Sequence, residues 1–141
     1  MSTPYMTTKV LFIDNDVTSF EFRKCMVKAL DRIPPIELFH AKDATEGLEM
    51  LEKFNPDVVV VDDELVEERD LFIESLNPIH PAIVLHTERP QVPPTRSSSF
   101  HGIDVTYLSK DESLAGLHDT LMKLTNIAGK IARMTETEQL H

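Results

Sequence analysis

Short apolar runs alternate with amphipathic stretches along most of this 141-residue chain. The clearest run is DVVVVDD at 57–63, where four consecutive valines predict a strand buried on both faces, as in the middle of a parallel sheet. Four other runs are typical of strands, at 9–14, 36–41, 81–87 and 105–109. The intervening stretches favour helices, at about 19–32, 44–54, 66–77 and from 113 to about 134. This alternation predicts an α/β fold with a doubly wound, five-stranded parallel sheet and right-handed crossovers.

The segment ERPQVPPTRSSSFHG, at 88–102, interrupts the alternation where a fourth helix should lie. Pro90, Pro93 and Pro94 exclude a regular helix through its first half, because proline lacks an N–H group and restricts the residue before it. We therefore expect the fourth helix to be short or irregular, at about 95–101.

The last helix extends beyond what is needed to cover the sheet. Its apolar residues recur three or four positions apart, as in a coiled coil. We hypothesise that these apolar residues form a seam, which pairs two copies of the chain or connects it to a partner. The alternative is that the end of the helix is a frayed amphipathic tail. The seam residues are Leu117, Leu121, Leu124, Ala128 and Ile131. The expected division is an N-terminal extension at 1–8, a domain at 9–125, and a helical extension and tail at 126–141.

Composition narrows the class of protein. Apolar residues make up 41% of the chain, enough for a core, but no run reaches the ~18 residues of a membrane span. Residues 1–8 lack the basic and apolar regions of a signal peptide, and the single Cys25 excludes an intramolecular disulfide, so we expect a cytoplasmic protein without membrane association. The net charge of −10, with no dense Lys/Arg patch, argues against nucleic-acid binding by this chain alone.

Polar side chains collect where the expected strands end. In open parallel sheets, ligand sites form beyond the carboxyl ends of the strands, so these groups should lie together. Clustered carboxylates need protons or a cation, Mg²⁺ prefers oxygen ligands, and a neighbouring lysine suits a phosphoryl group. The set therefore predicts a phosphoryl-transfer site. It comprises Asp14, Asn15, Asp16, Asp62, Asp63, Glu64, His86, Thr87, Ser109 and Lys110.

Two families fit this chemistry, and the order of their motifs separates them. DNDVT at 14–18 resembles the Asp-x-Asp-x-Thr start of haloacid-dehalogenase-type phosphatases, in which Asp14 would be the nucleophile. In that family a lysine and then an acidic pair follow the second-motif threonine. Here the acidic pair 62–63 precedes Thr87, and no acidic strand end follows Lys110, so the order disfavours a phosphatase.

The order acidic residues, Asp, Ser/Thr, Lys resembles the receiver domain of two-component response regulators, over about residues 8–125. The agreement is carried by KVLFIDND, NPDVVVVDDEL, PAIVLHTE and HGIDVTYLSKD. The resemblance implies a flavodoxin-like sheet of strand order 2-1-3-4-5. It also implies that Asp62 is the phosphoacceptor, that Lys110 contacts the phosphoryl group and that Tyr107 is the switch aromatic. The implied Mg²⁺ ligands are Asp14, Asn15, Asp62 and the backbone carbonyl of Glu64.

Several positions depart from the family pattern. Asn15 replaces a carboxylate ligand, so Mg²⁺ should bind more weakly unless Asp16 takes its place. The switch Ser/Thr position falls on His86, with Thr87 one residue later, and Asp111 replaces the proline that normally follows the lysine. These changes fall on the parts that sense and transmit phosphorylation.

The resemblance implies a regulatory domain rather than an enzyme. Asp62 would accept a phosphoryl group, with Mg²⁺, from a histidine kinase or phosphotransfer protein, and the domain would then bind a downstream protein partner. The departures leave a second hypothesis open, a pseudo-receiver that acts as a phosphorylation-independent interaction module. The other histidines lack the spacing of metal ligands and are expected at the surface; they are His40, His80, His101, His118 and His141.

Overall fold

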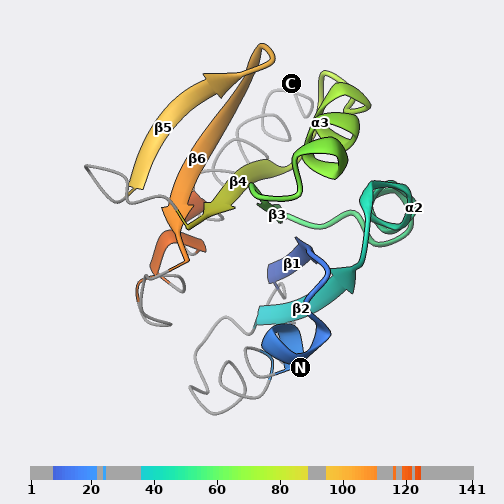
Figure 1. Ribbon diagram of the computed structural model, residues 1–141. Coiled ribbons are helices and arrows are strands. Elements are labelled where there is room, and N and C mark those ends of the chain that lie inside the picture. The colour runs from blue at the N-terminus through green and yellow to red at the C-terminus, as the bar shows by residue number, and fades with distance from the viewer. Residues whose placement is uncertain are drawn as a thin grey trace, which may run out of the picture.

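A mainly parallel sheet forms the centre of the computed structural model, which describes residues 8–21, 24, 36–88, 95–110, 116, 119–121, 123 and 124 (Figure 1). Within these residues the sheet has six strands in the order β2-β1-β3-β4-β6-β5. Five strands run parallel, which confirms the expected doubly wound core, and β5 runs antiparallel to β6. The strands are β1 Thr8–Ile13, β2 Ile36–Ala41, β3 Val58–Asp62, β4 Ala82–Thr87, β5 Thr95–Phe100 and β6 Ile103–Ser109.

The helices largely follow the amphipathic pattern. Helix α2 spans Ala44–Phe54, as predicted, and is capped at its N-terminus by Asp43, whose carboxylate accepts a hydrogen bond from the Glu46 N–H at 2.9 Å. Helix α3 spans Val66–Glu74 and ends earlier than expected, ahead of Pro78. Residues 17–21 and 24 are helical, as are 116, 119–121, 123 and 124. No helix in the described part of the chain is both long and apolar enough to cross a membrane.

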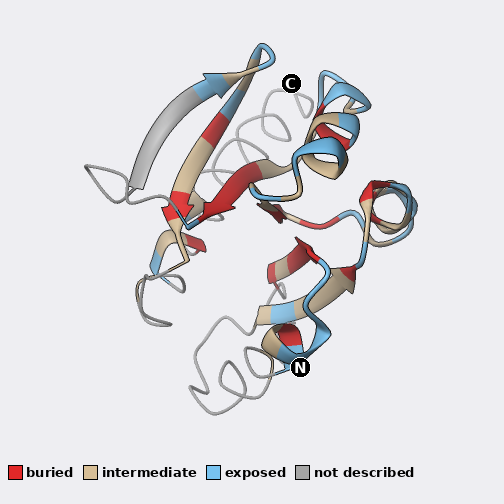
Figure 2. Cartoon of the chain, in the orientation of Figure 1, coloured by how far each residue is buried: buried red, intermediate tan, exposed pale blue. Residues whose placement is uncertain are grey.

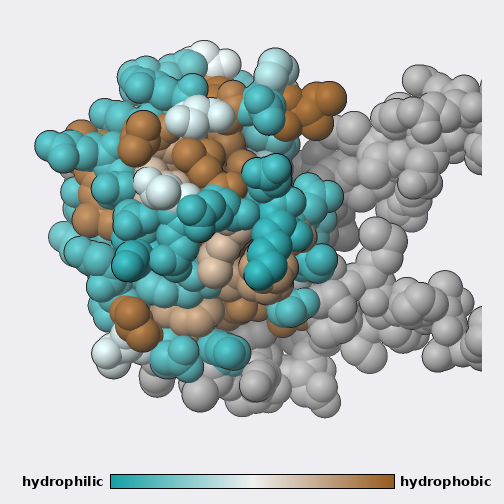
Figure 3. Space-filling view, turned by 90° about the vertical axis from the view of Figure 1, so that its right-hand side faces the viewer, coloured by the Kyte–Doolittle hydropathy of each residue, from teal (hydrophilic) through white to brown (hydrophobic). Residues whose placement is uncertain are grey.

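Alternate residues of the inner strands face two separate hydrophobic clusters, which are the red positions along the sheet in Figure 2. Leu11, Val59 and Leu85 face α2 and α3, which lie side by side on one side of the sheet (Figure 1). Phe12 and Val60 face the opposite layer. The outer face of α2 and α3 is mostly hydrophilic, with scattered apolar residues (Figure 3).

The opposite layer includes part of the expected seam. Leu121 is buried and Leu124 is partly buried against the same cluster, so both leucines pack on the sheet of their own chain. The other seam positions, Leu117, Ala128 and Ile131, lie outside the described residues. So do Cys25, most of the first helix, the segment 89–94, the expected extension at 126–141, and all of the expected extension at 1–8 except Thr8, which is the buried first residue of β1.

The segment expected to form a short fourth helix is strand β5 instead. It joins β6 through a two-residue turn, His101-Gly102, between the paired residues Phe100 and Ile103. His101 has φ 49° and Gly102 has φ 78°, the two positive values typical of a tight hairpin turn. Serine and threonine have low helix propensity, so the run TRSSS has little preference for a helix over an extended conformation. As a result β5 is the edge strand, and β6 lies inside the sheet.

Candidate functional site

The carboxyl ends of four parallel strands surround a polar cavity of about 470 Å³. The cavity contains side chains from each of the expected site segments. Its lining carries several carboxylates and the ammonium group of Lys110; the acidic residues are Asp14, Asp16, Asp62, Glu64 and Glu88. This excess of negative charge around one cavity favours the binding of cations.

Lys110 contacts two acidic residues at the carboxyl end of the central strand, Asp62 and Glu64. Its Nζ lies 2.8 Å from Asp62 Oδ1 and 3.1 Å from Glu64 Oε2. The Glu64 N–H also donates to Asp62 Oδ1, at 3.0 Å, and the Lys110 N–H donates to the Thr87 carbonyl at 2.7 Å. The pairing of Asp62 with Lys110, 48 residues apart in the chain, therefore brings together the two residues that the sequence singled out.

The pKa values of Asp62, Glu64 and Lys110 are shifted in different directions. Burial raises the pKa of Asp62, and the adjacent Glu64 side chain adds to the rise, while Lys110 opposes it. Burial also disfavours a charged Glu64, but hydrogen bonds from the Glu88 N–H and Lys110 outweigh it and lower the pKa of Glu64 to about 2. The two carboxylates in turn raise the pKa of Lys110 despite its partial burial. Glu64 and Lys110 are therefore both charged at neutral pH.

Asp14 is held by a histidine that the sequence did not single out. The carboxylate of Asp14 is buried at the end of β1, and His40 donates from Nε2 to both its Oδ1 and its carbonyl oxygen, at 2.9 Å each. The His40 ring stacks on Phe20, with centroids 4.8 Å apart. The expectation that His40 lies at the surface is wrong, since its side chain is only 12% exposed. The alternation in IELFHA, which gives His40 the same orientation as Leu38, was the available signal.

The two candidates for the switch position occupy different places. His86 pairs in register with Asp62, is buried and lines the cavity. Thr87 is fully buried, and its hydroxyl donates to Glu64 Oε1 at 3.4 Å. Tyr107 pairs with Leu85 on an inner strand and packs against the cluster on the α2 and α3 side. Of these three residues, only His86 lines the cavity beside Asp62.

The residues that could hold a hydrated magnesium ion lie at the carboxyl ends of β1 and β3. Mg²⁺ usually keeps several waters and uses one or two carboxylates, which Asp14 and Asp62 would supply together with the Asn15 amide and the Glu64 carbonyl. Across the described ranges, no three His, Cys, Asp or Glu side chains form a preassembled metal cluster. Asp16 accepts from the N–H and the hydroxyl of Ser19, at 3.0 and 2.6 Å, so it caps the first helix. It would have to leave this cap to replace the carboxylate missing at Asn15.

Arg69 links the residue after Asp62 to the β5–β6 hairpin. Its Nη1 lies 2.6 Å from Asp63 Oδ1 and 3.1 Å from the Asp63 carbonyl oxygen, and its guanidinium group stacks 4.7 Å from the centre of the Phe100 ring. On the same helix, Asp70 lies 3.7 Å from His101 at the hairpin turn. Asp63, the residue after Asp62, is thus connected to the tip of the hairpin through Arg69 of α3, a link that no sequence motif indicated.

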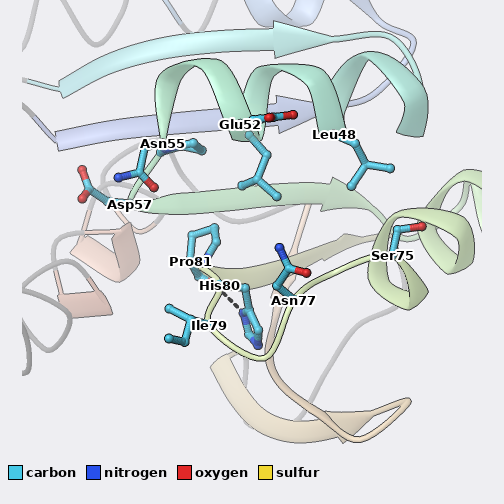
Figure 4. Close-up of a pocket in the computed structure, with 11 residues that line it drawn as sticks. Leu48, Glu52, Asn55, Asp57, Ser75, Asn77, Ile79, His80 and Pro81 are labelled. Carbon is cyan, nitrogen blue, oxygen red and sulfur yellow. Dashed lines mark hydrogen bonds between the residues drawn. The ribbon is translucent and has the colours of Figure 1, made fainter.

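A larger hollow of about 750 Å³ lies at the opposite edge of the sheet (Figure 4). Asp57 and Pro81, which precede β3 and β4, line it together with Leu48 and Ile79. The Asp57 carboxylate accepts a hydrogen bond from the Lys9 N–H at 2.8 Å. The chemistry expected of a phosphoryl-transfer site is found in the smaller, polar cavity, which we take as the candidate site.

Solved structures of receiver domains resemble this chain, although no family model and no curated protein sequence matches it. The signal receiver domain of a protein described as a Luxo repressor, from Vibrio parahaemolyticus, has a TM-score of 0.61 at 15% identity and covers 93% of this chain and 98% of that one. A response regulator receiver modulated diguanylate cyclase from Pelobacter carbinolicus has a TM-score of 0.56 at 17% identity, covering 85% and 97%. A LuxR family DNA-binding response regulator from Silicibacter pomeroyi has a TM-score of 0.54 at 14% identity, covering 84% and 92%. The chain therefore has the receiver-domain fold.

Proposed function

We propose that this chain is a phospho-acceptor domain of a two-component phosphorelay, with Asp62 as the acceptor. The observation that carries the proposal is the pair formed by Asp62 and Lys110, 2.8 Å apart in a carboxylate-lined cavity at the carboxyl end of the central strand. The receiver-domain fold supports the same conclusion. The donor would be a histidine kinase or a phosphotransfer protein, and a downstream protein partner would bind the phosphorylated form.

In the proposed reaction a carboxylate oxygen of Asp62 attacks the phosphorus of a phosphohistidine. The new O–P bond forms as the N–P bond breaks, and the imidazole nitrogen leaves with its electron pair and is then protonated. Lys110 neutralises part of the charge on the phosphoryl oxygens, because its ammonium group already lies beside the acceptor. His40 holds Asp14 in place at the same edge. Mg²⁺ bound through the Asp14 and Asp62 oxygens would supply further neutralisation of charge.

Intact-mass spectrometry tests the proposal. The wild type, Asp62→Ala and Asp104→Ala would each be incubated with Mg²⁺ and acetyl phosphate, and separately with a phosphorylated kinase or phosphotransfer domain. Asp104 is an exposed residue of β6 and serves as the matched control. We expect one added phosphoryl group on the wild type and on Asp104→Ala, and none on Asp62→Ala. A wild type that gains no phosphoryl group from any donor would refute the proposal.

A second candidate function is a phosphorylation-independent interaction module. The favouring observations are Asn15 at a metal position, Asp16 used as a helix cap, and a hairpin where the fourth helix was expected. A Mg²⁺ titration followed by NMR separates the two candidates. Saturable shifts at the Asp14 and Asp62 amides favour the phospho-acceptor, whereas no shifts at millimolar Mg²⁺ favour the interaction module.

A further inference from the structure

The Glu64 side chain is bound by three hydrogen-bond donors that converge from the carboxyl ends of β4 and β6. Its Oε1 accepts from the Glu88 N–H at 2.8 Å and from the Thr87 hydroxyl at 3.4 Å, and its Oε2 lies 3.1 Å from Lys110 Nζ. We call these three donors the oxyanion cradle: the Glu88 N–H, Thr87 Oγ1 and Lys110 Nζ. A backbone N–H, a hydroxyl and an ammonium group together suit any compact oxyanion, and a carboxylate occupies them here.

The oxyanion cradle lies directly beside the proposed acceptor. Lys110 Nζ belongs to the cradle and is also 2.8 Å from Asp62 Oδ1, so one ammonium group contacts both the occupant of the cradle and Asp62. The occupant is tethered, because Glu64 follows Asp62 by two residues and its N–H bonds the Asp62 carboxylate. A tethered ligand competes at a high effective concentration with any ligand arriving from solution.

We propose that Glu64 is an internal, displaceable ligand of the oxyanion cradle. It holds the three donors in place of a tetrahedral oxyanion and has to withdraw before such a group binds there. Its side chain is 34% exposed, so it has a route into solvent that leaves the backbone in place. For a phosphoryl group on Asp62 this inference rests on the proposed function, whereas for free inorganic phosphate it does not.

The charges in the cavity make the competition direct. The cavity already holds several carboxylates and one lysine, Lys110. An arriving phosphate is therefore repelled by the charge of Glu64, and it also finds the three donors of the oxyanion cradle already occupied. Glu64→Ala removes both obstacles. Glu64→Gln removes the charge but keeps the side chain, and it should release the oxyanion cradle only in part.

Binding of inorganic phosphate, in the absence of Mg²⁺, tests the inference. Calorimetry would measure affinity, and ¹H–¹⁵N NMR would follow the Glu88 amide and confirm that each variant is folded. We expect Glu64→Ala to bind phosphate at least ~10-fold more tightly than wild type, with a shift at the Glu88 amide. Glu67→Ala is the matched control, because Glu67 is an exposed glutamate in the first turn of α3 and its loss changes the net charge equally.

The double variant Glu64→Ala/Lys110→Met should lose the added affinity. Equal phosphate affinities for wild type, Glu64→Ala and Glu67→Ala would overturn the inference, and so would a gain that survives the loss of Lys110. If Glu64→Ala does not fold, the same comparison with Glu64→Gln decides, with a smaller gain in affinity expected and no gain refuting it.

Phosphorylation of Asp62 by acetyl phosphate separates this inference from the proposed function. We expect Glu64→Ala to be phosphorylated faster than wild type. Tighter phosphate binding without any phosphorylation would support the oxyanion cradle and refute the phospho-acceptor. Phosphorylation at equal rates, with no change in phosphate binding, would support the phospho-acceptor and refute the role of Glu64.

Discussion

Gly47 lies where α2 packs on β1. Its replacement by alanine has two opposed effects on stability, a gain in helix propensity and a loss from overpacking. Propensity alone predicts that Gly47→Ala stabilises α2 by ~1 kcal/mol. In the structure, however, a Cβ at this position would lie 2.6 Å from Ile13 Cδ1, 3.1 Å from Ile13 Cγ1 and 3.5 Å from Phe72 Cδ2. Ile13 and Phe72 are fully buried, so neither has open space into which to move. Overpacking of this kind costs ~1–3 kcal/mol, which leaves Gly47→Ala less stable than wild type by ~0–2 kcal/mol.

A second substitution tests whether the contact with Ile13 causes the loss. Ile13→Val removes the Cδ1 methyl group and by itself should cost ~0.5–1.5 kcal/mol. In the double variant the new Cβ occupies part of the space that this methyl group leaves. The two substitutions should therefore be non-additive, with a favourable coupling of ~1 kcal/mol.

Urea unfolding followed by circular dichroism measures all four proteins of this cycle. We expect wild type to be the most stable of the four. We also expect the double variant to be more stable than the sum of the two single changes predicts. If Gly47→Ala is more stable than wild type, or if the two changes add, the packing argument for Gly47 is wrong.

Three further predictions concern the candidate site. Because the pKa of Glu64 is about 2 in the folded protein and 4.5 ordinarily, its ionised form adds stability that is complete above pH 4.5 and lost as the pH falls towards 2. The free energy of unfolding of Glu64→Gln should therefore decline less than that of wild type over this range in urea titrations, and equal declines would contradict the prediction. His40→Phe keeps the stack on Phe20 but leaves buried Asp14 without this donor, and should lower the free energy of unfolding by ~1–3 kcal/mol, whereas unchanged stability would count against it. Arg69→Lys keeps the charge but loses the planar stack on Phe100, so amide hydrogen exchange at the hairpin turn should accelerate; an unchanged rate would show that the contact contributes little.

The sequence was sufficient to predict the parallel core and the proximity of Asp62 and Lys110. The valine run at 58–61 marks a strand with both faces covered, and the pattern of α2 gave its bounds correctly. Asp62 and Lys110 meet because parallel strands end at one edge of the sheet, a rule that needs no knowledge of side-chain packing.

The remaining features depend on tertiary contacts. Pro93 and Pro94 exclude a helix but do not specify a strand, and β5 is determined by its pairing with β6. The contact of His40 with Asp14 depends on the register of β1 against β2. The role of Glu64 depends on where a long, flexible side chain turns, which no spacing rule specifies.

The β5–β6 hairpin also has a consequence for the order in which the protein folds. Its strands are joined by two residues, whereas each parallel pair must close a long crossover before any contact forms. Hairpins of this kind form in about 1–10 μs, ahead of parallel pairing. Lys110 follows β6 and Asp62 ends β3. The strand that positions Lys110 would therefore form before the strand that positions Asp62. Pulse-labelling hydrogen exchange should find the amides of Ile103–Ser109 protected before those of Val58–Asp62.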